Sequence, residues 1–550
     1  MKNIITNTLI AGISVMTLAT GCVKETIPTD GATSDQIAES ATALQALVNA
    51  IPVNMTYPYS AFGSTENYGF DFGYPGMLCA TDAATGDVIC TAGDDASGYD
   101  WFTYWQSSLL LGPTQPVTPF FWNSHFVFIK ACNDVILTVG DQAATPVQKE
   151  ALGAAKAIRA NLYLDMARQY DPLDAEGYTI PDDIKGLTVP VIKETTTETE
   201  ARNNPRLTRE EIFTFIFGEL DGAEELLADS GSSSKTLPSL AVVYGLKARA
   251  YLWLGGFSDA YEKIPTGNDA YKKAAEYAEK AIAASGCTIS TESQWIDKKN
   301  GFNTATPAWM WYLPQSTEGI SNLVNFIAWR SNEATWGYGG RFVFEGTTSK
   351  FYGRISPTDF RRKVFVGPDP EAWYAQYGDL TNYAHEDFSA KIPPYGQFKF
   401  HPKDGNISTV TIGNVTDIPL MRVEEMYLIR AEATAHYDAA NGKKLLQEFM
   451  AARDAEYTVP AMNDLVDEII FQKRVELWGE GILFYDFKRL NMGIETGYTG
   501  TNAPSDCKFK TNGRAPWWNF CIPEREVNQN EALKGKNNPD PTNKIQPWRG

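Results

Sequence analysis

The sequence predicts a mostly α-helical protein in which a scaffold like that of tetratricopeptide repeats carries loop-rich, strand-containing insertions. Alanine-rich segments place their apolar residues at helical spacing over much of the chain. Two long stretches, residues 52–121 and 286–415, are instead rich in glycine, proline and aromatic residues. The chain has 550 residues, of which 43% are apolar and 21% are charged. That composition supports a large core and excludes wholesale disorder.

The first scaffold helices follow from this spacing. Residues 151–170 place alanines and larger apolar residues on one face, and Asp171-Pro172 should end the helix, because a residue before proline disfavours helical geometry. The same spacing predicts helices at residues 36–51 and 122–139.

The later helices are predicted by a cap and by repeat-like spacing. Residues 208–227 begin with a capping box at Thr208 and Glu211. Small and aromatic residues in the segment 240–260 follow the order of a tetratricopeptide repeat, with a partner helix at 270–284. Further candidate helices are residues 420–437, 444–453 and 464–490. Such helices bury their faces only against neighbours, so we expect them to stack into one solenoid.

The N-terminus resembles a bacterial lipoprotein signal. Lys2 precedes an apolar stretch of eleven residues, Leu9 to Ala19, which is too short to span a bilayer, and small residues lead to Cys22. We predict a signal peptide at residues 1–21, acylation of Cys22 and a flexible tether at residues 22–34. The alternative is an ordinary secretory signal whose cysteine is incidental. Under either interpretation we expect the chain to leave the cytoplasm.

Charge and motif content exclude several functions. The net charge of −19 would repel a phosphate backbone, so no nucleic-acid partner is predicted. Four histidines without His-x-x-x-His or Cys-x-x-Cys spacing predict no metal site and no cofactor. Aspartates such as Asp71, Asp82 and Asp87 lack the order of a calcium loop, and we expect them to form turns and solvated charge.

Six cysteines follow Cys22, and export would expose them to an oxidising compartment. Cys79 with Cys90, and Cys507 with Cys521, would close short loops, although six cysteines allow fifteen pairings and the connectivity stays open. A nucleophilic cysteine is less favoured, since no histidine lies near any of them in sequence.

The order of several segments is similar to the SusD/RagB family of outer-membrane nutrient-binding lipoproteins. The matching segments are AKAIRANLYLDMARQYDP, LPSLAVVYGLKARAYLWLG, IPLMRVEEMYLIRAEATAH, IIFQKRVELWGEGILFYDFKRL and IPEREVNQNEAL. The resemblance implies a tetratricopeptide-type scaffold, a lipid-anchored position on the outer-membrane surface and a SusC-like TonB-dependent transporter as partner. Ile482 and Leu483 depart from the family, which often has His-Arg after the Glu-Gly, and this puts a local polar network there in doubt.

This resemblance assigns residues 35–550 to a single SusD-like domain. Its helical scaffold comprises residues 35–51, 122–284 and 418–492; residues 52–121 and 286–415 form the ligand-binding insertions, and residues 493–550 the C-terminal segment. Sugar rings present an apolar face and a rim of hydroxyls, which aromatic rings and planar polar groups complement. The predicted ligand-binding residues are Trp101, Tyr104, Trp105, Tyr312, Trp336 and Arg341.

Each of these aromatic residues also has a structural interpretation. Trp101 to Trp105 fits the first turns of a buried helix. Trp311 and Tyr312 alternate as in a strand, so one of the two should face the core. Trp336 precedes a glycine-rich stretch, Gly337 to Gly340, whose flexibility favours exposure, and a tryptophan packed over a turn is the structural alternative.

The strongest catalytic candidates are Glu476 and Glu480, four residues apart on one helical face. Lys473, Arg474 and Arg489 are close in sequence, which favours a structural ion-pair cluster over a glycosidase pair. The sequence therefore predicts a non-enzymatic surface receptor that captures an oligosaccharide or polysaccharide and passes it to the transporter. The alternatives are a RagB-like peptide receptor, a surface glycan hydrolase and a purely structural helical adaptor.

Overall fold

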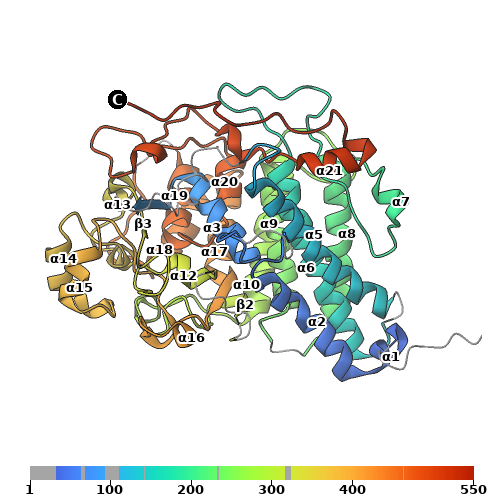
Figure 1. Ribbon diagram of the computed structural model, residues 1–550, viewed down its shortest axis with the longest axis horizontal. Helices are drawn as coiled ribbons and strands as arrows, with labels where there is room; N and C mark the ends of the chain where they lie inside the picture. Colours follow the sequence, from blue (N-terminus) through green and yellow to red (C-terminus); the bar gives the residue numbers. More distant parts are fainter. Residues whose placement is uncertain are drawn as a thin grey trace, which may run out of the picture.

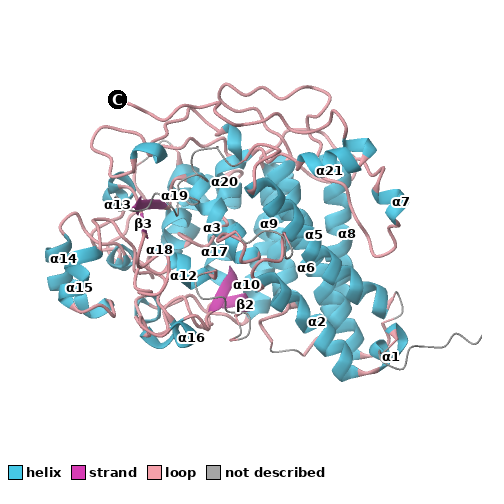
Figure 2. Ribbon diagram, in the orientation of Figure 1, coloured by secondary structure: helices cyan, strands magenta, loops and turns pink. Residues whose placement is uncertain are grey.

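The computed structural model describes residues 33–62, 68–92, 111–140, 143–231, 234–315, 317, 324–461 and 464–550. Helices dominate it and the few strands are short, as Figure 2 shows, so the predicted mostly α fold class is confirmed. Trp101, Tyr104, Trp105 and Cys22 lie outside the described residues. Within the described residues, no helix combines the length and the apolar character needed to cross a membrane.

The long helices form one continuous scaffold, in which each packs on the next along the chain (Figure 1). They are α2 (Ala41–Thr56), α5 (Val117–Val139), α6 (Pro146–Tyr170), α8 (Arg209–Leu227), α9 (Leu240–Gly255), α10 (Gly267–Ser285), α17 (Val423–Ala435), α18 (Ala439–Met450) and α19 (Leu465–Glu476). Helix α10 packs directly on α17 although more than a hundred residues separate them in sequence. The residues between them therefore leave the scaffold and return to it.

Local sequence explains where these helices begin and end. The Thr208 side chain accepts the Glu211 N–H and the Glu211 side chain returns to Thr208, the capping box that was predicted. Helix α6 begins at a second such box on Thr145 and stops at Tyr170, as the following Asp171-Pro172 predicts. Helix α9 has the predicted bounds.

Three predicted helices differ from the structure. The segment 36–51 is divided at Ser40, which has an extended backbone and caps α2, so the residues before it form a separate short helix, α1 (Ser34–Glu39). The segment 420–437 begins as a strand, β4 (Asp417–Arg422), which pairs antiparallel with β2 (Trp309–Pro314) and includes Pro419. A proline has no N–H for a helical hydrogen bond, and the partner strand comes from far away in sequence. The segment 464–490 breaks after α19, because Gly479 and Gly481 adopt positive φ angles of 78° and 79°, and it resumes as α20 (Phe484–Arg489).

Two loop-rich segments project from the scaffold: the early segment (residues 57–116) and the late segment (residues 286–416). They contain more short helices than strands, and these account for most of the remaining elements. The early segment contributes α3 (Tyr74–Thr85) and β1 (Ile89–Ala92); the late segment contributes α11 (Glu292–Trp295), β2, α12 (Phe326–Arg330), β3 (Val343–Gly346), α13 (Ser349–Arg354), α14 (Pro370–Tyr377), α15 (His385–Lys391) and α16 (Val410–Gly413). Strands β1 and β3 pair antiparallel, which joins the two segments.

The six described cysteines are free thiols, so the disulfides considered from the sequence are not formed. Five of the six are buried. Cys79 lies on a fully buried helix, and burial raises the pKa of its thiol, as it does for Cys132 and Cys521. Packing in the core, instead of loop closure, therefore accounts for these cysteines. The remaining short helices are α1 (Ser34–Glu39), α7 (Glu198–Ala201) and α21 (Glu524–Gln529).

We predict that Gly255→Ala destabilises the scaffold by about 1–3 kcal/mol, because a Cβ at this position overlaps the Tyr271 ring where α9 packs on α10. Gly218→Ala is the matched control: it lies within α8, and a Cβ there meets nothing within 4 Å. Helix propensity should make that variant more stable by about 0.5–1 kcal/mol. Urea unfolding followed by tryptophan fluorescence measures both; equal effects would contradict this packing.

Candidate functional site

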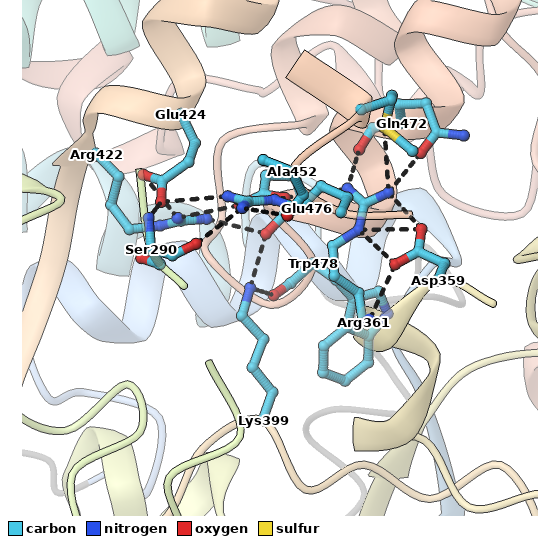
Figure 3. A network of polar contacts seen from close by, with 12 residues as sticks. Ser290, Asp359, Arg361, Lys399, Arg422, Glu424, Ala452, Gln472, Glu476 and Trp478 are labelled. Carbon is cyan, nitrogen blue, oxygen red and sulfur yellow. Dashed lines mark hydrogen bonds and ion pairs between the residues drawn. The ribbon is translucent and has the colours of Figure 1, made fainter. Parts of the chain in front are cut away.

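The acidic pair Glu476 and Glu480 lies in a buried ion-pair network at the end of α19. Figure 3 shows the part of this network around Glu476. The Glu476 carboxylate accepts hydrogen bonds from Arg361 at 3.0 Å and from Arg453 at 2.9 and 3.1 Å. The Glu480 carboxylate accepts from Arg422 at 2.8 Å and from Lys399 at 2.6 Å. The predicted structural ion-pair cluster is confirmed, but its cations come from elsewhere in the chain.

The cations that the sequence placed next to this pair bind other carboxylates. Lys473 and Arg489 both pair with Glu432 and Asp486. Arg474 pairs with Asp87 of the early segment. Proximity in sequence was misleading because these three cations are neutralised by Glu432, Asp486 and Asp87, which the fold brings to them.

The electrostatics of the network do not suit a general acid. Burial alone would raise the pKa of Glu476, but Arg453, Arg422 and Arg361 together hold it far below its ordinary value. Arg422 and Lys399 likewise lower the pKa of Glu480 against the effect of burial. A glycosidase needs one carboxyl group with a raised pKa beside one that stays ionised, and both of these stay ionised.

A second buried cluster joins the early and late segments to each other. Arg330 of α12 pairs with Asp82 of α3, and it donates to Glu345 of β3 at 3.0 Å. All three side chains are buried. Burial outweighs the attraction of Arg330 and raises the pKa of Asp82 and of Glu345 to about 7. Two carboxyls that share one guanidinium thus hold protons near neutral pH.

The expectation that Asp71, Asp82 and Asp87 are solvated was wrong, because each is at most 5% exposed. Asp71 accepts the Ala61 N–H at 3.0 Å, and Asp87 accepts from Arg474. Within the described part of the chain, no group of three or more histidine, cysteine or acidic side chains is placed to hold a metal ion.

Next to the Arg330 cluster, aromatic rings from the two segments form what we call the aromatic junction: Tyr68, Phe70 and Phe72 from the early segment, with Trp329 and Tyr338 from the late one. Trp329 stacks on Tyr338 with ring centroids 4.5 Å apart, and its indole N–H donates to the Gly69 carbonyl at 3.0 Å. Phe70, Phe72 and Trp329 are buried, whereas Tyr68 and Tyr338 are half-buried. Fixed inner rings thus support an outer layer that reaches the surface.

The glycine-rich stretch after Trp336 is held in place and is not a flexible loop. A Cβ on Gly337 would lie 2.6 Å from the Ala328 carbonyl oxygen, and one on Gly339 would lie 2.6 Å from that of Ser331. Glycine is therefore required at both positions, because the chain there lies in close contact with the backbone of α12 and of Ser331, the residue after α12. Tyr338 joins the aromatic junction, while Trp336 packs toward Gly413 on another side.

The described ligand candidates from the sequence are not gathered at one point. Trp336 is half-buried, and its indole N–H is buried without a hydrogen-bond partner among the described residues. Arg341 is exposed, with its guanidinium 5.4 Å from the Phe342 ring centroid. Tyr312 is half-buried on β2, where its N–H donates to the Lys235 carbonyl, and the adjacent Trp311 faces the core. That strand alternation agrees with the sequence.

Sequence reasoning did not select Tyr68 and Tyr338, the outer rings of the aromatic junction. Both stand beside glycines; a Cβ on Gly69 would lie 3.7 Å from Trp329 and from the Tyr338 hydroxyl, so these rings lie within van der Waals reach of the Gly69 position. The sequence signal that could have identified Tyr68 and Tyr338 is an aromatic residue next to a glycine, a pattern present in both loop-rich segments. Which of these rings meet in space depends on pairing across more than 250 residues.

Comparison with known proteins places the chain among SusD-like structures. The family model described as the SusD family matches residues 299–540. A SusD-like carbohydrate binding protein from Bacteroides vulgatus ATCC 8482 is 21% identical with a TM-score of 0.65, and the match covers 90% of this chain and 98% of that one. No sequence match was found among curated proteins.

Two further solved structures share the fold. A SusD superfamily protein from Bacteroides thetaiotaomicron VPI-5482 is 17% identical, with a TM-score of 0.64 and coverage of 91% of this chain and 100% of that one. Surface glycan-binding protein A from Bacteroides thetaiotaomicron, solved with laminarihexaose, is 16% identical, with a TM-score of 0.61 and coverage of 90% and 99%. The resemblance predicted from the sequence is thus confirmed by the family model and by the fold.

We predict that Glu476→Gln destabilises the protein by about 3–5 kcal/mol at neutral pH, since it leaves buried arginines without their carboxylate. Because the folded pKa of Glu476 is lowered, its stabilisation is present above the ordinary glutamate pKa of 4.5 and is lost as the pH falls below that value. The variant should therefore lose less stability than wild type on acidification. Urea unfolding at a series of pH values tests this; parallel pH profiles would contradict it.

We predict the opposite pH dependence for the Arg330 cluster. Because the folded pKa values of Asp82 and Glu345 are raised to about 7, the native state holds protons that the unfolded chain releases. The free energy of unfolding should fall as the pH rises from about 5 to about 7, by up to ~1.4 kcal/mol per pH unit for each proton. Glu345→Gln should reduce this slope, whereas the exposed control Glu386→Gln should keep it. Equal slopes in both variants would refute the assignment.

Proposed function

We propose that this chain, whose residues 299–540 match the SusD family and whose fold is that of SusD-like structures, is a cell-surface receptor that captures oligosaccharides without cleaving them. The observation that best supports this proposal is the aromatic junction. There, two segments far apart in sequence place half-buried aromatic rings over a layer of buried ones. The relative solved with laminarihexaose supports a glycan as the ligand class.

The chemistry of the junction suits a sugar ring. An aromatic face offers an apolar surface to the C–H face of a sugar, and each ring contributes about 0.5–1.5 kcal/mol. Three such contacts at the upper end of this range supply about 4 kcal/mol, which corresponds to a millimolar dissociation constant. Arg341 is exposed beside the ring of Phe342, which in turn neighbours Tyr338 of the aromatic junction, and its guanidinium is available to a hydroxyl rim. Weak binding of this kind suits a receptor that must release its ligand.

The proposal includes delivery to a SusC-like TonB-dependent transporter and anchoring in the outer membrane through acylated Cys22. The transporter follows from the family resemblance, and the anchor from the lipoprotein-like residues before Cys22. In this proposal residues 1–21 are removed, residues 22–34 act as the tether, and residues 35–550 form the receptor domain.

Three other functions fit the same scaffold less well. A peptide receptor would need dedicated partners for backbone amides, whereas stacked rings favour flat apolar ligand faces. A hydrolase would need an acid and a base, and Glu476 and Glu480 are buried and ion-paired. A purely structural adaptor would not require partly exposed aromatic rings where the early and late segments meet.

Tyr338→Ala should weaken glycan binding about tenfold, because it removes one stacking ring. Isothermal titration with a panel of soluble glycans that includes laminarihexaose measures this. Tyr437→Ala is the matched control, since that tyrosine is 40% exposed at the end of α17 and distant in sequence from both loop-rich segments; it should bind as wild type. The double variant Trp101→Ala, Trp336→Ala tests the sequence-selected rings in the same way.

The same titration separates the alternatives. Saturable heat from peptides and none from any glycan would overturn the sugar assignment and favour the peptide receptor. New reducing ends after incubation of the purified protein with polysaccharide would identify a hydrolase. Wild-type affinity in both Tyr338→Ala and the Trp101/Trp336 variant would place the ligand away from these rings.

A further inference from the structure

A groove of about 540 Å³ lies between the start of α5 and the C-terminal helix α21. Figure 1 shows helix α21 at the upper end of the helical scaffold. The Glu524 N–H donates to the Pro113 carbonyl at 2.9 Å, which ties α21 to the approach to α5. On α5, Asn123 donates to the Ala61 carbonyl at 3.0 Å. Three distant parts of the chain thus fix the shape of the groove.

The lining combines ring faces with planar polar groups. Phe62, Pro113 and Pro119 contribute apolar surface. A carboxylate, a guanidinium and an amide come from Glu524, Arg525 and Gln529 on α21. This is the combination that complements the apolar face and the hydroxyl rim of a sugar.

Three polar side chains of this groove are not committed to other partners, whereas Asn123 bonds to Ala61 and Glu526 bonds to Trp122. Among the described residues, the side chains of Glu524, Arg525 and Gln529 make no hydrogen bond or ion pair, and all three are exposed. In a larger groove of about 810 Å³ near α7, some of the polar side chains are already in use. There Glu200 caps Thr197, and Asn204 bonds to the Val191 carbonyl.

The groove is continuous with the proposed glycan surface through one residue. Phe62 lines the groove, and its ring meets Tyr68 of the aromatic junction edge to face, with centroids 4.8 Å apart. A sugar chain that stacks on Tyr68 would therefore lie next to the groove lining at Phe62.

We propose that the groove between α5 and α21 is a second carbohydrate subsite, which contacts sugar units beyond those stacked on the aromatic junction. The inference rests on the proposed function and adds a requirement for ligand length. Phe62, Pro113 and Pro119 form its apolar surface, and Glu524, Arg525 and Gln529 bond to ring hydroxyls. Long oligosaccharides then bind more tightly than short ones of the same linkage.

The test uses isothermal titration to compare a disaccharide with a hexasaccharide of the same linkage. Laminaribiose and laminarihexaose are used first; if they do not bind, the tightest-binding linkage series of the glycan panel replaces them. In the double variant Arg525→Ala, Gln529→Ala we expect the hexasaccharide to bind about 5- to 20-fold more weakly, since each lost hydrogen bond to a charged or planar group costs up to about tenfold. The disaccharide should bind as to wild type. Glu524→Gln serves as a second variant that keeps the shape of the side chain.

Lys272→Ala is the matched control, since it removes an exposed cation on α10, away from the groove. It should leave both affinities unchanged, and equal melting temperatures show that all variants fold. If wild type binds a glycan while the hexasaccharide affinity is unchanged in both groove variants, the subsite is refuted and the receptor stands. If wild type binds no glycan, the proposed function fails and the subsite with it.

Discussion

Buried charge that must be neutralised holds the loop-rich segments to the helices, and it does so at one short turn. The turn after α19, residues 476–481, receives Lys399 and Arg361 from the late segment and Arg422 from β4. From the early segment, Asp82 accepts the Gly481 N–H at 2.9 Å, and Thr81 donates to the Gly481 carbonyl at 2.8 Å. A buried carboxylate without its cation is strongly destabilising, so each of these attachments depends on the others.

The turn at residues 476–481 contains glycines and is followed by apolar residues, yet it holds a polar network. Its geometry explains this combination. Gly479 and Gly481 have positive φ, and a Cβ on either would overlap Phe400 of the late segment or Leu78 of the early one. The sequence left a polar network in doubt because Ile482 and Leu483 replace the polar pair often found there. The structure builds the network from Glu480 on the preceding side of the turn, with cations supplied by Lys399 and Arg422.

Features set by local sequence could be predicted, and features set by distant pairing could not. The capping box at Thr208 and the stop at Asp171-Pro172 act within a few residues, so helices α6 and α8 were found from the sequence. Strand β4 exists because β2, a hundred residues earlier, lies beside it, and no local pattern records that. The candidate site has the same limitation: Tyr338 was visible as one aromatic among many, but its stacking on Trp329 and the approach of Gly69 are contacts across the fold.

The two loop-rich segments are joined into one unit by contacts between them. Strands β1 and β3 have four residues each, and a two-stranded pair of this length is marginal in water without further packing. That packing comes from Arg330, which bridges Asp82 and Glu345 directly beside the pair, and from the buried rings of Phe72 and Trp329. Because the same contacts fix the base of the aromatic junction, the spacing of its outer rings is set by the interior and not by loop flexibility. Substitutions of the outer rings, Tyr68 and Tyr338, should then leave the support beneath them unchanged.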